Sequence, residues 1–278
     1  MPIRRVLLPF TDLGALETIA RTAFLVGQQH QAQVRGLLVQ RAHLDVPFRG
    51  EYVEPDVMRR VVDAARKERE ELRKRASGTF HELAGQFPAV EAEFSVTEGD
   101  VAANAAHEAR LSDLCILASG AGSANGEGDE LRDAALFRSG RPVLLVPHGG
   151  VAANSFERVV IAWKESVEAA RAVAAAQPFL MNATQVHLVT VGDGDEAATS
   201  LQDVEQYLQL HYAEVRSELL RKRGGKEVSD ILQHKAEVLG GAVLVMGAFS
   251  RWRWREQLFG GVTDSVLREA RVPIVMAR

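Results

Sequence analysis

The sequence contains two copies of one pattern, one in each half of the chain, and this duplication constrains the fold more than any other feature. Residues 4–8 (RRVLL) correspond to residues 157–161 (ERVVI), a charged residue followed by an apolar strand. An alanine-rich amphipathic helix is predicted after each strand, followed by a second strand. The helices are predicted over 16–26 and 167–180, and the second strands over 33–39 and 185–191. Each copy closes with an Arg- and Pro-containing strand, at 141–146 and 271–276.

Strands that alternate with helices and are apolar on both faces are typical of a parallel sheet covered by helices. We predict five strands per copy. Residues 147–155 have the Gly/Ala/Asn composition of a linker, which predicts domains at 1–148 and 156–278.

The two copies differ in the elements that follow the second strand. The first has a long helix predicted over 57–87, whose outer face carries opposite charges four residues apart, as solvated helices often do. The second has a short helix predicted over 201–211 and a third strand over 213–220.

The composition is that of an ordinary soluble globular protein, with 46% hydrophobic and 25% charged residues among 278. A net charge of −4 gives no reason to expect nucleic acid or an anionic membrane as a partner. The apolar runs are shorter than the roughly 20 residues that cross a bilayer, and the N-terminal run ends too early for a signal peptide. We therefore expect a cytoplasmic protein.

The single cysteine, Cys115, lies inside an apolar run and is expected to be a core residue.

A glycine-containing segment near the end of the second copy carries the strongest functional signal. A predicted strand over 242–246 ends on Gly247, and Gly260-Gly261 opens a predicted helix over 262–270. Glycine at a strand end lets a ligand approach the backbone, and a helix start presents free N–H groups to an anion. The Thr263 hydroxyl would add a donor. The segment therefore has the features that hold phosphate groups.

In a doubly wound sheet, ligands bind beyond the carboxyl ends of the strands, where the strand order reverses. In the second copy this point is expected between the strands that end at Ala162-Trp163-Lys164 and at Met246-Gly247. Lys164 could neutralise phosphate charge there. The simpler interpretation makes Gly247 a tight turn, Gly260-Gly261 a close helix–sheet contact and Lys164 a surface charge. The residues predicted to form the site are Ala162, Trp163, Lys164, Val191, Met246, Gly247, Ser250, Gly260, Gly261, Val262 and Thr263.

The loop inside this segment contains Arg251-Trp252-Arg253-Trp254-Arg255. Interleaved Arg and Trp can stack on bases and bind phosphates, but one short run in an acidic protein argues against nucleic acid. A lid over the crevice and a surface for a protein partner stay open as interpretations. All three tryptophans are expected near this one site.

The first copy keeps the scaffold without the glycine pair. Its corresponding segment, residues 119–130, contains glycine, but the next helix opens on Glu130-Leu131-Arg132-Asp133. Acidic side chains there would satisfy the helix N-terminus and repel phosphate. We therefore expect this half to be structural, with a degenerate nucleotide loop.

The segment over 246–276 resembles the end of a universal stress protein domain, and further matches lie at 6–9, 98–101, 141–147 and 161–166. The resemblance implies a tandem universal stress protein. Such a protein has two flavodoxin-like (adenine nucleotide alpha hydrolase-like), doubly wound, five-stranded parallel sheets, packed as a pseudo-dimer through their last strands. The family includes members that bind ATP and members that bind no nucleotide.

ATP-binding members carry Gly-x2-Gly-x9-Gly-(Ser/Thr). This sequence matches at Gly247 and Gly260, and departs at Ser250, where glycine is expected, and at Gly261, where Ser or Thr is expected.

Those members also have an aspartate at the end of strand one, on the adenine side of the nucleotide. Lys164 replaces it in the second copy and Thr11 in the first, where Asp12 comes one place late. The resemblance therefore implies either ATP or another adenine nucleotide with Mg²⁺, or no ligand, and it weakens the expectation of adenine selectivity.

The sequence shows no catalytic set. Its eight histidines have no metal-ligand spacing, and neither a nucleophile elbow nor a P-loop motif is present. The leading hypothesis is a stress-response regulatory or binding protein that is not an enzyme. The alternatives are a slow nucleotide phosphohydrolase or transferase, at most a weak ATPase, at the same crevice, and a pure protein-interaction module. We also expect a homodimer, because exposed last-strand edges and family precedent favour association. The sequence does not identify any other protein partner.

Overall fold

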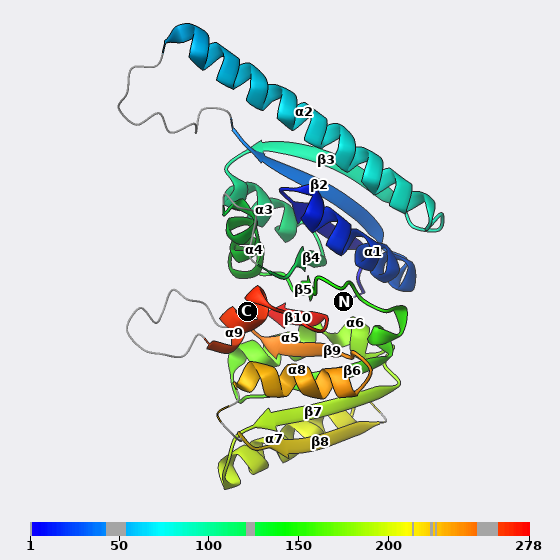
Figure 1. Ribbon diagram of the computed structural model, residues 1–278. Coiled ribbons are helices and arrows are strands. Elements are labelled where there is room, and N and C mark those ends of the chain that lie inside the picture. Colours follow the sequence, from blue (N-terminus) through cyan, green and yellow to red (C-terminus); the bar gives the residue numbers. More distant parts are fainter. Residues whose placement is uncertain are drawn as a thin grey trace.

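The computed structural model describes residues 2–42, 54–120, 126–212, 214–222, 225, 227–248 and 261–278. These residues form a single ten-stranded sheet with the order β3-β2-β1-β4-β5-β10-β9-β6-β7-β8 (Figure 1). Neighbouring strands are parallel within each half of this order. The strands are β1 (Arg5–Phe10), β2 (Gln33–Arg41), β3 (Ala92–Gly99), β4 (Leu114–Ala118), β5 (Val143–Val146), β6 (Arg158–Ala162), β7 (Gln185–Val191), β8 (Val215–Leu220), β9 (Val243–Gly247) and β10 (Ile274–Ala277).

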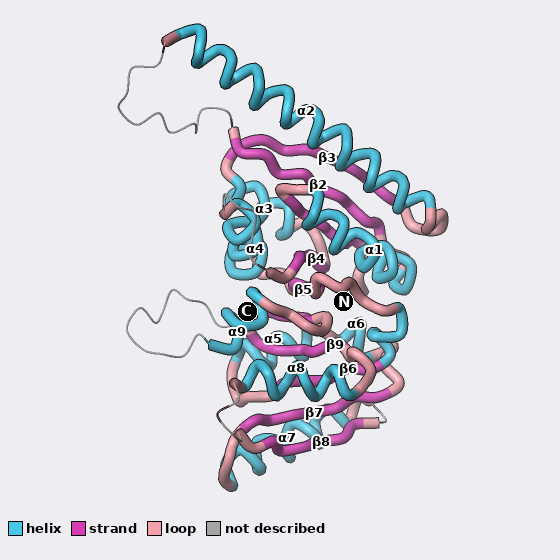
Figure 2. The backbone as a smooth tube through the Cα atoms, in the orientation of Figure 1, coloured by secondary structure: helices cyan, strands magenta, loops and turns pink. Residues whose placement is uncertain are grey.

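Helices cover both faces of the sheet (Figure 2). One core lies under α1, α2, α5, α6 and α7, and a second lies under α3, α4, α8 and α9. Each core contains residues from both halves, so the halves share their packing. The helices are α1 (Leu13–His30), α2 (Pro55–Gly85), α3 (Val101–Arg110), α4 (Glu127–Arg138), α5 (Val167–Ala175), α6 (Gln177–Leu180), α7 (Asp195–Gln209), α8 (Val228–Val238) and α9 (Gly261–Arg268), with a 3₁₀ turn at Ala153–Glu157.

The central strands, such as β4 and β9, are apolar on both faces because each face meets a layer of helices. In β4, Leu114 and Ile116 belong to one core and Cys115 and Leu117 to the other. Successive side chains of a strand point to opposite faces, so this assignment follows from the pleat. The predicted α/β class with doubly wound halves is confirmed. The domain limits 1–148 and 156–278 stay a prediction.

One predicted helix is in fact two. The expected helix over 167–180 ends after α5 and restarts as α6, with Ala176 as the shared cap and a proline in the first turn of α6. Pro178 has no N–H to continue the helix and would clash with the preceding turn, which explains the break. The other predicted helices are present with shifted ends, for example 55–85 for the long helix expected over 57–87.

The two halves meet through their last strands. β5 and β10 pair antiparallel at the centre of the sheet, with Val275 opposite Leu144. Their pairing agrees with the pseudo-dimer that the resemblance implied. The expectation of exposed last-strand edges is wrong, because β5 and β10 each have a strand on both sides. The outer edges of the sheet are β3 and β8, so association of two chains would require another surface.

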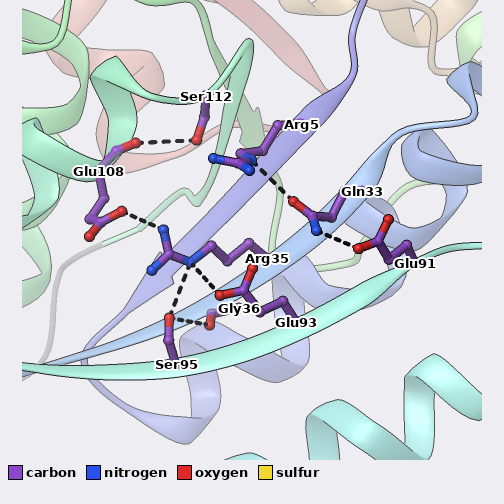
Figure 3. A network of polar contacts seen from close by, with 9 residues as sticks. All are labelled: Arg5, Gln33, Arg35, Gly36, Glu91, Glu93, Ser95, Glu108 and Ser112. Carbon is purple, nitrogen blue, oxygen red and sulfur yellow. Dashed lines mark hydrogen bonds and ion pairs between the residues drawn. The ribbon is translucent and has the colours of Figure 1, made fainter.

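A polar network ties α3 to the strands of the first half (Figure 3). The Arg35 guanidinium on β2 pairs with the Glu108 carboxylate of α3 at 2.5 Å and with Glu93 of β3 at 3.4 Å. Its Nε also donates to the Ser95 hydroxyl at 3.3 Å. The Arg35 guanidinium therefore joins its own strand β2 to β3 and to α3.

Candidate functional site

The predicted site lies where the strand order of the second half reverses. β6 has β7 on one side and β9 on the other. All three strands are parallel, so their ends at Ala162, Val191 and Gly247 reach the same edge of the sheet. The start of α9 reaches this edge too, because α9 must run back along the sheet before β10 pairs parallel with β9. These ends form the topological switch point at which ligands bind in doubly wound sheets.

Trp163 is fixed at the end of β6 by three hydrogen bonds. Its backbone N–H donates to the Val189 carbonyl at 2.8 Å, and its carbonyl accepts from the Thr190 hydroxyl at 3.1 Å. Its indole Nε1–H donates to the Ser200 hydroxyl on α7 at 3.1 Å. The ring is partly buried and packs against the core. Sequence reasoning named Trp163 but missed Ser200, which orients the ring.

Lys164 is exposed in a loop that is longer than its counterpart in the first half. In the first half, Asp12 caps α1 with one residue between it and the end of β1, and its carboxylate accepts from Ala15 N–H at 2.9 Å. In the second half, Ser166 caps α5 after three residues, and its hydroxyl accepts from Ala169 N–H at 3.1 Å. The longer loop gives Lys164 its exposed position at the strand end.

Gly247 allows α5 to pack closely on β9. A Cβ added there would lie 2.7 Å from the backbone N of Ala169 and 2.7 Å from the carbonyl carbon of Glu168, both in the first turn of α5. Real Cβ contacts of this length do not occur, so glycine is required for α5 to lie on β9. The space beside its Cα is filled by the protein itself. The tight turn that the simpler interpretation suggested does not describe Gly247, which is the last residue of β9.

Gly261 has the opposite environment. It is the first residue of α9, it is exposed, and a Cβ added to it would meet no atom of the described residues within 4 Å. It is therefore not a close helix–sheet contact. Val262 is half-buried, Thr263 is buried beneath the helix start, and the carboxylate of Asp264 pairs with Arg268 one turn later.

Met246 is buried in β9. Two predicted site residues, Ser250 and Gly260, lie outside the described residues, as does the run from Arg251 to Arg255. The expectation that all three tryptophans gather at one site therefore stays a prediction, with Trp163 in place at the strand end.

The corresponding point of the first half is occupied by an ion-pair network. Arg41, the last residue of β2, pairs with Glu127 at 3.1 Å and with Glu130 at 2.5 Å, both in the first turn of α4. These hydrogen bonds raise the pKa of Arg41. The acidic helix start expected from the sequence is present, and the chain's own arginine neutralises it. Sequence reasoning missed Arg41, because its partners lie more than eighty residues later in the chain.

The segment after β4 is joined to the last turn of α9 in the other half. The Gly120 N–H at the end of β4 donates to the Leu267 carbonyl of α9 at 3.1 Å. The Gly120 carbonyl accepts from the buried Arg132 guanidinium at 2.7 Å. Gly120 has a φ of 113°, and a Cβ there would lie 2.3 Å from His148 Nε2, so this position requires glycine.

Neither a nucleophilic cysteine nor a metal cluster is found in the part of the chain that the structure describes. Cys115 is fully buried, and burial raises the pKa of its thiol well above the usual range. Among the described residues, no group of three or more His, Cys, Asp or Glu side chains could hold a metal ion. Within the same residues, no helix combines the length and the apolar character needed to cross a membrane.

The strand order and the switch-point geometry define a doubly wound α/β protein with two halves in one chain. A scan of the sequence against protein-family models and a search of curated proteins give no match.

Solved structures do match over the whole chain. A universal stress protein from Archaeoglobus fulgidus DSM 4304 superimposes with a TM-score of 0.71 at 17% identity, covering 99% of this chain and 98% of that one. A functionally unknown protein from Pseudomonas aeruginosa PAO1 gives 0.55 at 14% identity, covering 99% and 92%. A proposed universal stress protein from P. aeruginosa UCBPP-PA14 gives 0.54 at 15% identity, covering 99% and 93%. The fold of this chain is thus that of a tandem universal stress protein.

Proposed function

We propose that this chain is a tandem universal stress protein, a stress-response binding protein that holds a phosphate-bearing ligand in the second-half crevice. An adenine nucleotide is the first candidate. The observation that carries the proposal is the position of the α9 start at the switch point, beside the ends of β6 and β9, where Gly261 is exposed and an added Cβ would meet no atom of the described residues within 4 Å. The N–H groups of a helix start have no partner within the helix and carry roughly half a positive charge, which favours an anion.

The charges around the two helix starts favour the second half over the first. At α4, Glu127 and Glu130 already occupy the first turn and are paired with Arg41. At α9, the acidic residue of the first turn is Asp264, which pairs with Arg268. Lys164 adds an exposed cation at the neighbouring strand end. A phosphate would therefore meet more carboxylates in the first half than in the second.

The residues that would contact the base of a nucleotide favour stacking on an aromatic ring over recognition of one base by hydrogen bonds. Trp163 is a flat, partly buried ring held by Ser200, and Ala162 and Lys164 on either side of it have no carboxylate. Stacking on an aromatic ring tolerates different bases. We propose that affinity follows the number of phosphates rather than the identity of the base, and that Mg²⁺, when present, is carried by the phosphates.

The described residues supply no catalytic constellation, so we propose a binding role with no turnover or very slow turnover. A slow phosphohydrolase at the same crevice is the alternative. Phosphate release from ATP and Mg²⁺ in steady state distinguishes the two, since sustained release that is lost in Gly261→Asp would establish the enzyme. The cytoplasmic location expected from the sequence stays a prediction.

The test is a titration of the purified protein with ATP, ADP, AMP and GTP, followed by tryptophan fluorescence and by native mass spectrometry. In Gly261→Asp, a carboxylate at the helix start should weaken binding by about tenfold. Its fold should be unharmed, because an acidic residue is favourable at that position. Gly149→Asp is the matched control, since Gly149 is also exposed and open. No retained ligand and unchanged fluorescence in the wild type would exclude the crevice as a nucleotide site.

A further inference from the structure

The edge strand β8 directs backbone groups away from the sheet. Among the described residues its one strand neighbour is β7 (Figure 1). The Gly192 N–H donates to the Leu220 carbonyl at 2.9 Å, so the backbone groups of Leu220 face β7. Successive residues of a strand direct these groups to alternate sides, and those of Val215, Ser217 and Leu219 therefore face the open edge.

The helices on either side leave this edge accessible. Ser217 is exposed, and its hydroxyl donates to the Glu205 carboxylate of α7 at 2.6 Å, so α7 stops short of the outer side of β8. On the other face, α8 packs on β6, β7 and β9. It reaches β8 through the ion pair of Lys235 with Glu218 at 2.5 Å. A further strand could therefore approach β8 between the two helical layers.

The charged side chains of β8 are complementary to those of a second, antiparallel copy in one register. With a two-fold axis at Ser217, Arg216 lies opposite Glu218 of the second copy, and Val215 lies opposite Leu219. Facing residues of opposite charge stabilise an antiparallel pair, and like charges destabilise it. An axis one residue earlier would place Arg216 opposite itself, and an axis one residue later would do the same for Glu218. The charges therefore select the register at Ser217.

The backbone fits the same register. An axis at Ser217 brings the outward-facing groups of the two strands opposite one another. Arg216 and Glu218 then form the pairs without hydrogen bonds, in which facing side chains lie closer together. Their side chains are 67% and 48% exposed. Glu218 would lie between Lys235 of its own chain and Arg216 of the second copy.

The opposite edge of the sheet lacks this complementarity. The strand β3 contains Glu93 and Glu98 and no Lys or Arg, so two copies of it would bring together only acidic charges. The long helix α2 also lies along this edge and projects past it (Figure 1). The charge pattern thus favours β8 over β3 as a surface for self-association.

We propose that the β8 edge binds a second copy of this chain, with the two β8 strands antiparallel about a two-fold axis at Ser217. The interface then uses the same residues on both sides, and the two sheets continue into one another. It contains one unfavourable contact, because the two Glu205 carboxylates, each bound to a Ser217 hydroxyl, come near the axis. The interface is independent of the nucleotide proposal.

The expected dimer is weak, because a pair of 6-residue strands buries less than the roughly 1,200 Å² of a stable interface. The first test is sedimentation velocity of the full chain from low micromolar to several hundred micromolar. Arg216→Glu places like charges opposite one another twice, and it should weaken association by roughly tenfold or more. Arg171→Glu is the matched control, since it changes the net charge equally and Arg171 is exposed on α5, which packs on β9 and β10.

A wild type that stays monomeric throughout this range would overturn the proposal. So would an Arg216→Glu variant that associates like the Arg171→Glu control.

A charge exchange tests the register. Glu218→Arg should weaken self-association as Arg216→Glu does. An equimolar mixture of the two variants should form dimers again, because each facing pair then joins an Arg to a Glu. The double variant with both substitutions in one chain should also associate, for the same reason. Failure of the mixture to associate would exclude this register.

Two substitutions of Ser217 test the backbone pairing. Ser217→Pro removes an N–H that faces the open edge and no bond to β7, so the sheet should persist while association is lost. Ser217→Ala is the matched control, because it keeps the N–H and removes the same hydroxyl. Urea unfolding checks that both variants are folded. Equal association of the two would exclude pairing through the β8 backbone.

The position of the axis has its own test. Glu205→Gln removes the like charges near the axis and keeps an acceptor for the Ser217 hydroxyl. Association should strengthen by about two- to fivefold. A variant that associates more weakly than the wild type would contradict an axis at Ser217.

Discussion

At the scale of single residues, Gly247 and Gly261 of the predicted phosphate-binding segment have different structural roles. Gly247 is required because the first turn of α5 lies against it, whereas Gly261 leaves an open helix start. Their sequence context is similar, and both were predicted to contact a ligand. What distinguishes them is a helix that begins about eighty residues earlier in the chain, and a local pattern contains no information on that contact.

Replacing these two glycines by alanine should have opposite outcomes. Gly247→Ala forces a methyl group to within 2.7 Å of backbone atoms of α5, which should cost about 1–3 kcal/mol of the free energy of unfolding. Gly261→Ala meets no atom of the described part of the chain within 4 Å and should be neutral or slightly stabilising, because alanine is the better helix former. Urea unfolding of both variants measures the difference. Equal stability of the two would contradict the close packing of α5 on β9.

At the scale of elements, the presence of most helices and strands could be predicted from the sequence, whereas the residues at which they begin and end were predicted less accurately. Alternation of apolar strands with amphipathic helices located the parallel units, and the strand expected over 242–246 is present as β9 (Val243–Gly247) because these residues form an uninterrupted apolar run. The break at Pro178 was missed although proline carries that signal. The pairing of Arg41 with the start of α4 could not be predicted, because it joins residues more than eighty positions apart.

The attachment of α3 to the sheet should depend on one side chain. Arg35→Met keeps the bulk of the side chain but leaves Glu108 and Glu93 without their cation (Figure 3). Both Arg35 and Glu108 are about four-fifths buried, with side-chain exposures of 19%, so the loss should cost about 1–3 kcal/mol in denaturant unfolding. Arg35→Lys should recover part of it. If instead Arg35→Met equals the wild type, the network contributes no stability.

At the scale of the whole molecule, the two halves form one packed unit. They share both cores, and helices of different halves meet at His30 of α1 and Phe179 of α6, whose rings lie 5.5 Å apart. The internal duplication made two similar units predictable. Their antiparallel junction through β5 and β10 was implied by family resemblance and not by the residue pattern, since a strand apolar on both faces does not specify its neighbour.

The contact at His30 makes stability dependent on pH. The ring Nε2 is buried without a hydrogen-bond partner, and burial lowers the pKa of His30 below its ordinary value of 6.5. The unfolded chain therefore binds this proton more readily than the folded protein does, so stability should fall as the pH drops below about 6.5. Urea unfolding on either side of that pH measures the effect.

His30→Phe should reduce this dependence without removing it, because burial and the nearby Lys235 and Arg216 also lower the pKa of His187. A variant with an unchanged pH dependence would show that His30 is not the responsible group.

The central position of β10 also has a consequence for synthesis. On the ribosome, β5 emerges long before β10, which lies at residues 274–277. The β5 edge of the first half therefore stays unpaired until these residues have been translated. A nascent chain stalled within the second half would display that edge to its neighbours. Chaperone binding during translation should consequently begin at the first half and end when the final strand closes the sheet.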